Sequence, residues 1–375
     1  MSAKSARKSV RKGKLAVTIV YLSRPRREPV PPEEFRRLLS CYLRSQYSSA
    51  DRAKYGDIED WDTGFIRDMS RAFKGRAAFN ADISRWNTSN VVTMQSMFEG
   101  VEHFNQDISG WDTSSVVSMK KMFYGAGRFN QDLTGWDTSN VRTMSSMFED
   151  ASEFNGQVGS WNTGNVRSMK AMFAEASSFN QPLCGWDTGK VRDMSCMFLD
   201  AVAFNQCLAG WGVSRVKSMW RMFEGATSFD RPLNHWDVSS VTDMALMFSE
   251  AECFDQPLDR WQVGRVTTME GMFNGASSFN QDIGGWDTGK VENMVRLFCD
   301  AKVFNQPLRG WDVSRVKDMT NMFAGARAFD QDLSSWTPAA LECMLGMFCR
   351  AASFTHSLAV FPCELLSEVL FAYED

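Results

Sequence analysis

The chain has 375 residues, of which 44% are hydrophobic, with 9 cysteines, 3 histidines and a formal net charge of −4. This hydrophobic content excludes a largely disordered chain, three scattered histidines give no metal-binding cluster, and an odd number of cysteines without a CxxC pair argues against a disulfide framework. The charge is uneven, because residues 1–60 hold 14 Lys+Arg and 7 Asp+Glu, whereas residues 61–375 hold 27 and 38.

Residues 1–31 are predicted to form a basic leader. Residues 1–27 carry nine basic residues and no acidic one, and their longest apolar run extends from Leu15 to Leu22. This run is too short to cross a membrane, and no small-residue cleavage site of a secretory signal follows it. Its β-branched content predicts a strand over residues 15–22. A flexible basic tail leading into this strand and a targeting peptide are the two interpretations.

Residues 32–60 are predicted to form a helical cap. Pro32 suits the first turn of a helix, and Glu33 and Glu34 would lie at its positive end. Apolar residues at helical spacing predict a helix from about Pro32 to Gln46. We expect this helix to cover the first repeat, which would otherwise expose an apolar end.

A 25-residue unit is written twelve times over residues 61–360. Its tryptophan recurs without insertion at positions 61, 86, 111, 136, 161, 186, 211, 236, 261, 286, 311 and 336. One methionine and two phenylalanines are also invariant, namely Met119, Phe123 and Phe129 in the third copy. A fixed period is typical of a stacked array whose units bury their apolar residues on one another. The predicted core column includes Trp111, Trp136, Trp161 and Trp186.

Each repeat is expected to hold a two-turn helix and a short parallel strand. Apolar residues from Val116 to Ala126 have helical spacing, and the residue before the invariant methionine is Asp, Ser, Thr or Asn in eleven copies, as at a helix N-cap. A glycine such as Gly125, present in half the copies, is typical of a left-handed helix end. Prolines at 182, 232, 257 and 307 restrict any strand to a short one around Gln131–Thr134. The predicted fold class is therefore an α/β repeat solenoid.

A polar residue follows the second phenylalanine of every repeat. It is Asn or Asp in eleven copies, and Thr355 is the exception. A buried amide there could bond backbone groups at a turn and recur as a ladder, since an unpaired buried group costs about 1–3 kcal/mol. The alternative is a solvated turn residue. The predicted ladder includes Asn105, Asn130, Asn155 and Asn180.

Residues 361–375 are predicted to form a C-terminal cap. Phe361 takes the next tryptophan place, and the preceding repeat departs from the pattern at Thr337, Pro338 and Ala339. Apolar residues at helical spacing predict a closing helix over Cys363–Tyr373. A repeat that decays in this way is typical of a capping unit.

The repeat resembles a known bacterial unit. The stretches WDTSNVRTMSSMFEDASEFN at 136–155 and FNQDIGGWDTGKV at 279–291 are similar to the bacterial surface-protein repeat of about 25–26 residues. That repeat occurs in BspA-like leucine-rich-repeat surface proteins and in a mycoplasma lipoprotein domain of unknown function. The resemblance covers residues 61–361 and implies a leucine-rich-repeat-like right-handed coil in a surface protein that binds or adheres. It transfers no catalytic residue, and the chain lacks a lipobox cysteine.

No catalytic motif is found, so we expect a binding or scaffold protein without cofactor or metal rather than an enzyme. The fifth and seventh repeat positions are often basic, and residues two apart on an extended segment point to the same side. Stacked repeats would then present a cationic strip to an acidic protein partner, although charged residues can also serve only to solvate a face. The candidate strip comprises Lys190, Arg192, Arg215, Lys217, Arg265, Lys290, Arg315 and Lys317. The seventh position is also basic at Arg67, Arg142 and Arg167.

Two further functions remain open at this stage. One is a surface adhesin that binds host or glycan ligands, as the resemblance implies. The other is a polyanion or nucleic-acid binder that uses the basic leader, although the acidic body makes nucleic acid a poorer match. The location is also open, because free cysteines favour an intracellular protein and the resemblance favours the cell surface.

Overall fold

The computed structural model describes the backbone of residues 5–11, 14–20 and 27–368. The first two ranges are strands β1 (Ser5–Arg11) and β2 (Lys14–Val20), which pair antiparallel with Val10 opposite Leu15. The predicted strand over 15–22 therefore corresponds to β2, and residues 21–22 lie outside the described residues. Residues 5–11, expected within a flexible leader, form the partner strand.

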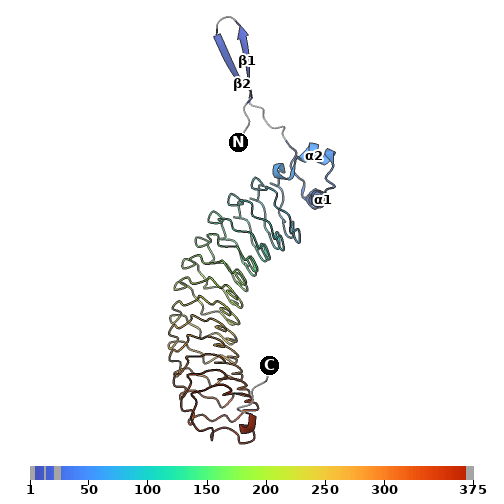
Figure 1. Ribbon diagram of the computed structural model, residues 1–375. Coiled ribbons are helices and arrows are strands. Elements are labelled where there is room, and N and C mark those ends of the chain that lie inside the picture. Colours follow the sequence, from blue (N-terminus) through green and yellow to red (C-terminus); the bar gives the residue numbers. More distant parts are fainter. Residues whose placement is uncertain (1–4, 12–13, 21–26, 369–375) are drawn as a thin grey trace.

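The cap precedes the repeats (Figure 1). It consists of α1 (Pro32–Leu43), α2 (Ser49–Tyr55) and the 3₁₀ helix η1 (Ile58–Asp60), so α1 ends three residues before the predicted end at Gln46. The ring of Phe35 packs edge-on against Trp61, with centroids 6.4 Å apart. The Arg36 guanidinium donates to the carbonyl of Ser70 at 2.5 Å. The cap thus covers the first repeat and bonds its open backbone edge. No helix in the described ranges is both long and apolar enough to cross a membrane.

The twelve repeats form stacked coils that are held together by backbone hydrogen bonds between coils. Parallel bridges join the eighth residues of successive coils, from Asp68 with Thr93 to Asp318 with Cys343. Beyond each bridge, every second N–H donates to the next coil, as Met119 does to Thr143 at 3.2 Å. We call the surface formed by the eighth to fifteenth residues of the coils the ladder face. The chain is therefore a repeat protein whose coils consist of turns and single bridges.

The predicted helix in each repeat is wrong. The eleventh and fifteenth residues have positive φ in all twelve coils, for example 56° at Lys121 and 65° at Gly125. A left-handed residue ends an α-helix, so the chain makes separate turns such as Met122 N–H to Met119 O at 3.1 Å. These turns recur every three to four residues. They therefore bury apolar residues at the same spacing as an amphipathic helix would. The glycine signal at the fifteenth position did mark a left-handed residue.

The predicted strand is also absent from its expected place. Residues 131–134 have no strand or bridge; instead the Asp132 carboxylate accepts the Thr134 N–H at 2.8 Å and closes a local turn. The inter-coil bridges lie at the eighth position, which was interpreted as a helix N-cap. The closing helix expected over 363–373 begins as a 3₁₀ turn, η2 (Leu366–Glu368), and its remainder lies outside the described residues.

The tryptophans form a stacked column inside the coils. The rings of Trp136 and Trp161 lie 6.3 Å apart, as do those of Trp161 and Trp186, with interplanar angles of 5° and 3°. Each indole N–H from Trp86 to Trp336 donates to a carbonyl 28 residues earlier, as Trp161 does to Leu133 at 2.9 Å. The predicted core column, including Trp111, is therefore both buried and hydrogen-bonded.

A second column consists of the Asn/Asp side chains after the second phenylalanine. The Asn105 side-chain oxygen accepts the backbone N–H of Asn130 at 3.0 Å, Asn130 accepts that of Asn155, and Asn155 accepts that of Asn180. The series runs from Asn80 to the N–H of Thr355. These side chains were expected to be buried, but they are exposed or half-buried. They nevertheless form the predicted Asn/Asp ladder and not solvated turns.

The stack is curved because its columns have different spacings. The Trp136 and Trp161 rings are 6.3 Å apart, whereas the Phe123 and Phe148 rings of the same coils are 5.5 Å apart. Backbone segments that are hydrogen-bonded side by side lie about 4.8 Å apart. The coils are therefore spaced more widely at the tryptophan column than at this phenylalanine column, and Figure 1 shows the stack as a curved arc.

Candidate binding surfaces

The fifth and seventh positions of neighbouring coils line a common hollow. Its volume is about 250 Å³, and its lining includes Asn140, Arg142, Asn165, Arg167 and Lys190. All eight residues of the candidate strip are exposed. The hollow lies where each coil enters the ladder face, so the fifth- and seventh-position side chains can contact one ligand.

Four cationic residues follow one another at the seventh position, and we call Arg142, Arg167, Arg192 and Lys217 the basic column. Their backbones are joined in series, with Arg167 N–H to Arg142 O at 3.0 Å and Lys217 N–H to Arg192 O at 3.0 Å. Within residues 27–368, none of the four forms an ion pair with a carboxylate. Arg142 and Arg167 were outside the candidate strip, although their repeat position is the same.

The C-terminal half of the candidate strip differs in its charges. Lys317 forms an ion pair with Glu292 at 2.7 Å, and its ammonium lowers the pKa of that carboxyl. The seventh position is Thr242 and Thr267 in the two coils before Glu292. Arg265, Lys290 and Arg315 are exposed, but they lie beside this mixed row. The structure therefore concentrates unpaired positive charge between residues 142 and 217 rather than along all eight candidates.

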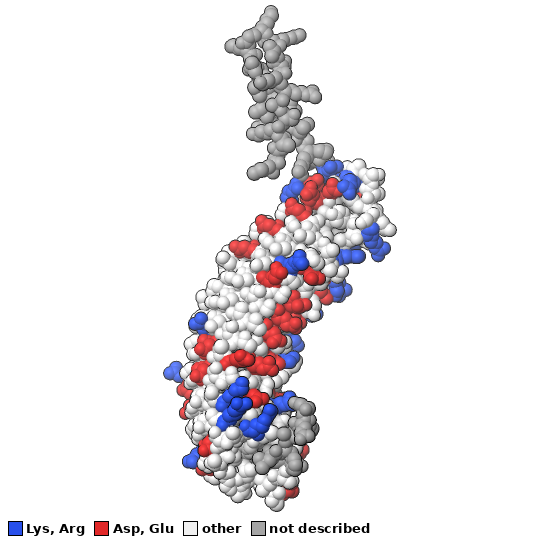
Figure 2. Space-filling model, viewed as in Figure 1, with Lys and Arg blue, Asp and Glu red and all other residues white. Residues whose placement is uncertain are grey.

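Acidic residues occupy the opposite side of the ladder face. We call the following fourteenth- and fifteenth-position residues the acidic edge: Glu149, Asp150, Glu175, Asp200, Glu224 and Glu250. Figure 2 shows acidic side chains gathered along the middle of the stack. Burial, and then the neighbouring carboxylates, raise the pKa of Glu175. The ladder face of the middle coils thus lies between a positive and a negative edge.

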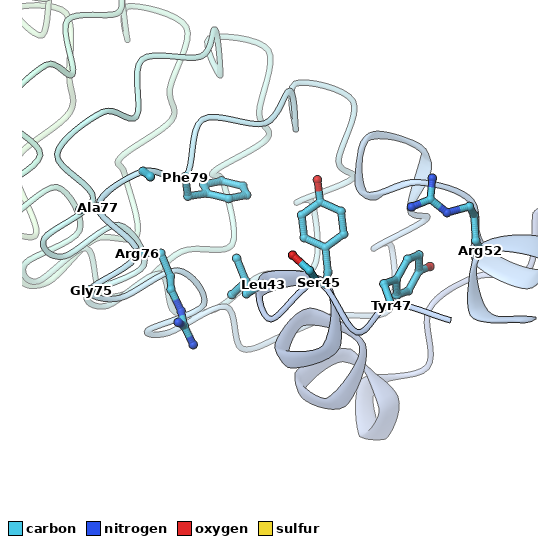
Figure 3. A pocket seen from close by; sticks show the side chains of 10 residues that line it. Leu43, Ser45, Tyr47, Arg52, Gly75, Arg76, Ala77 and Phe79 are labelled. Atoms are coloured by element: carbon cyan, nitrogen blue, oxygen red, sulfur yellow. The ribbon is translucent and has the colours of Figure 1, made fainter. Parts of the chain in front are cut away.

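A cavity of about 690 Å³ lies between the cap and the first coil. Figure 3 shows Tyr47 and Arg52 on the cap side and Phe79 reaching toward the cap from the first coil. Burial raises the pKa of Tyr47, whose hydroxyl accepts the Trp61 indole N–H at 3.1 Å. No periodic signal indicated this cavity, because it depends on contacts between the non-repeating cap and a repeat.

Among the residues that the structure describes, no three His, Cys, Asp or Glu side chains are arranged to hold a metal ion. All nine cysteines are free. Burial raises the pKa of Cys196 and of Cys299 to about 11, so both are neutral thiols at physiological pH.

Comparison with known protein families identifies the relationship. The family described as "Mycoplasma protein of unknown function, DUF285" matches residues 41–153, 131–234, 206–302 and 281–369. The chain belongs to this family. Each match spans several coils, so the family unit is a group of coils rather than one repeat. No curated protein and no solved structure matches the chain. The mycoplasma part of the resemblance is thereby confirmed, and the family description names no activity or ligand.

Proposed function

We propose that this chain is a non-enzymatic binding protein that engages an acidic protein partner through the basic column. One observation carries the proposal. Four successive coils present a cationic side chain at the same position, and none of these side chains pairs with a carboxylate in the described part of the chain. Charged residues that merely solvate a face are expected to alternate in sign, as they do in the seventh-position row beyond residue 267.

The four cations of the basic column repel one another. Their backbones lie about 4.8 Å apart, but the side chains are exposed and screened by solvent, so this repulsion is weak. An acidic partner would replace this repulsion with attraction. Because one exposed ion pair contributes only about 0–1 kcal/mol, useful affinity requires contact with several coils at once.

The surroundings of the column are already ordered. The Asn140 side chain donates to the Ser114 carbonyl at 2.7 Å, and the Asn165 side chain donates to the Ser139 carbonyl at 2.8 Å. Lys190 donates to the Asn165 side-chain oxygen at 2.8 Å. A surface that is held in place loses less conformational entropy on binding, and arginine can bind a carboxylate with two hydrogen bonds.

The test is a titration of the full chain with polyglutamate at low and physiological salt. Reversal of all four basic-column residues to Glu should abolish binding and leave thermal unfolding nearly unchanged, because these side chains are exposed. The matched control reverses Arg265, Lys290, Arg315 and Lys317 and should retain most of the binding. Equal binding by the parent and the basic-column variant would show that the column is only a solvated face.

A duplex oligonucleotide in the same titration tests the polyanion alternative. Binding of the duplex that depends on residues 1–27, and not on the basic column, would favour the leader as the binding element. The relationship to BspA-like leucine-rich-repeat surface proteins is a separate proposal. It is supported by the similarity of the repeat residues at 136–155. This proposal does not extend to the expected helix and strand in each coil, which the structure lacks over residues 61–360.

A further inference from the structure

The ladder face contains a hollow with an apolar floor and a largely polar rim beside the acidic edge. Its volume is about 540 Å³, and Ala171, Ala174 and Cys196 form a buried cluster at its floor, with exposures of 7%, 1% and 7%. Leu199 and Trp220 pack against this cluster and remain half-exposed. Trp220 is the only tryptophan outside the repeat register. The cluster is separate from the main core.

The hollow results from a local change in side-chain size. The eleventh repeat position carries Ser146, Ala171 and Cys196 in three successive coils, between Lys121 on one side and Arg221 on the other. The backbone beneath cannot close the gap, because Ala171 N–H donates to the Ser195 carbonyl and Cys196 N–H to the Trp220 carbonyl, both at 2.8 Å. The hollow therefore persists above a buried apolar floor, and the half-buried Leu199 and Trp220 offer apolar surface beside it.

Trp220 is held at the border of the hollow. The Arg221 guanidinium lies over its ring, 5.3 Å from the centroid. Arg221 is itself fixed by Glu224, with Nη2 and Oε1 2.9 Å apart. A rigid, half-exposed aromatic ring offers apolar area at small entropic cost, so an apolar side chain that covers it is stabilised by its burial.

The charges around the hollow specify which partner fits. Glu149 lines it, and Asp150, Glu175 and Asp200 continue the acidic edge without an ion pair among the described residues. These carboxylates favour a basic occupant. Three lysines also line the hollow, namely Lys120 and Lys121 of the third coil and Lys170 of the fifth coil. They lie at the tenth and eleventh repeat positions, whereas the acids lie at the fourteenth and fifteenth, so they disfavour positive charge on their own side and direct the basic side chains of a segment to the acidic edge.

We propose that this hollow docks an extended basic segment of a partner protein. The segment places an aliphatic side chain on Ala171, Ala174 and Cys196, against Trp220, and its lysines or arginines along the acidic edge. This inference goes beyond the acidic-partner proposal, because it adds a second binding surface of opposite charge, on the ladder face that the basic column borders. The two surfaces have opposite ligand preferences, so either can fail without the other.

The binding test uses the full chain and a short fluorescent peptide of alternating lysine and leucine. We expect saturable binding that weakens with salt. A lysine–serine peptide should bind at least about tenfold more weakly, since burying one leucine contributes about 1.5–3 kcal/mol and 1.4 kcal/mol is tenfold. In the chain with the basic column reversed, which removes the proposed site for acidic ligands, a glutamate–leucine peptide should bind no better than the lysine–serine peptide. Equal binding of the lysine–leucine and lysine–serine peptides would overturn the role of the hollow.

A pair of matched variants locates the binding. Ala174→Tyr fills the hollow with a residue that the chain already accommodates at this repeat position, as Tyr124. It should weaken the lysine–leucine peptide by about tenfold or more. Ala324→Tyr makes the same change at the same position six coils away and should have no effect. Equal effects of the two variants, or no effect of Ala174→Tyr, would contradict the proposal.

The charge requirement has its own variant. Asp150→Asn, Glu175→Gln and Asp200→Asn together keep side-chain shape and remove three negative charges, and asparagine tolerates the positive φ found at these sites. The combined variant should weaken lysine–leucine binding and reduce its salt dependence, whereas Asp300→Asn should not. Unchanged binding would mean that the peptide adheres without using the acidic edge.

Discussion

The interior of the coils and their ladder face follow different rules. Inside, each coil contributes the same tryptophan and phenylalanines, so Trp161 and Trp186 have nearly identical surroundings. On the ladder face, the eleventh residue changes from Ser146 to Cys196 to Arg221 over a few coils. Stacking requires the repeated residues, whereas the residues that break the repeat produce the hollow and the two charged edges. The residues that recur hold the coils together, and the proposed binding surfaces lie among the residues that differ between coils.

The largest expected effect comes from truncating a repeated interior residue. Trp186 is stacked between Trp161 and Trp211 at 6.3 and 6.2 Å, and its indole donates to Val158 O. Trp186→Ala should lower the free energy of unfolding by about 3–5 kcal/mol in chemical denaturation. Trp220→Ala, outside the register, should cost much less. A loss below about 1 kcal/mol for Trp186→Ala would remove the distinction between interior and surface.

A smaller effect is expected in the polar column. Asn155→Ala removes the acceptor of the Asn180 N–H and of the Gln181 side chain, at 3.0 and 3.1 Å. Because these groups are half-buried, we expect a loss of about 1 kcal/mol, at the low end for an unsatisfied donor. Asn162→Ala, which removes only an exposed local turn bond to Gly164, is the control for thermal unfolding. Equal losses of stability in the two variants would mean that the Asn/Asp column contributes no more to stability than a local turn does.

The left-handed positions should give a modest gain. Glu175 has φ of 59° where half the coils carry glycine. Glu175→Gly relieves the steric cost of positive φ, and after the entropy of glycine is subtracted we expect a gain of about 0.5 kcal/mol. Glu175→Ala removes the charge but keeps the steric cost, so its melting temperature should be lower than that of the glycine variant. The reverse order would argue against strain at this position.

The smallest effect is a pH dependence at the acidic edge. Burial and neighbouring carboxylates raise the folded-state pKa of Glu175 above its ordinary value. The associated stability is present below the unfolded pKa of about 4.3 and is lost as pH rises through the folded pKa. Glu175→Gln should therefore gain stability over the parent as pH increases from about 4 to 7. A difference in melting temperature between the two proteins that stays constant across this pH range would contradict a raised pKa of Glu175 in the folded state.

The sequence predicted features that depend on period and failed on features that depend on backbone angles. Trp136 and Asn130 could be placed because a 25-residue repeat aligns equivalent residues in successive coils. The turns could not be distinguished from a helix, because left-handed residues such as Lys121 have ordinary helix-forming side chains and leave no compositional signal. The hollow could not be predicted either. The small residues Ala171 and Cys196 lie beneath a hollow only because hydrogen bonds between coils fix the spacing of the backbone there.

The central claim is that residues which differ between groups of coils make two binding surfaces of opposite charge, one on the ladder face and one along its border. The most direct test titrates three proteins with polyglutamate and with the lysine–leucine peptide. The three proteins are the parent, the basic-column variant with all four cations reversed, and the acidic-edge variant with three acids neutralised. We expect the basic-column variant to lose only polyglutamate and the acidic-edge variant to lose only the peptide. Loss of both ligands in either variant, or of neither ligand in both, would contradict two separate binding surfaces.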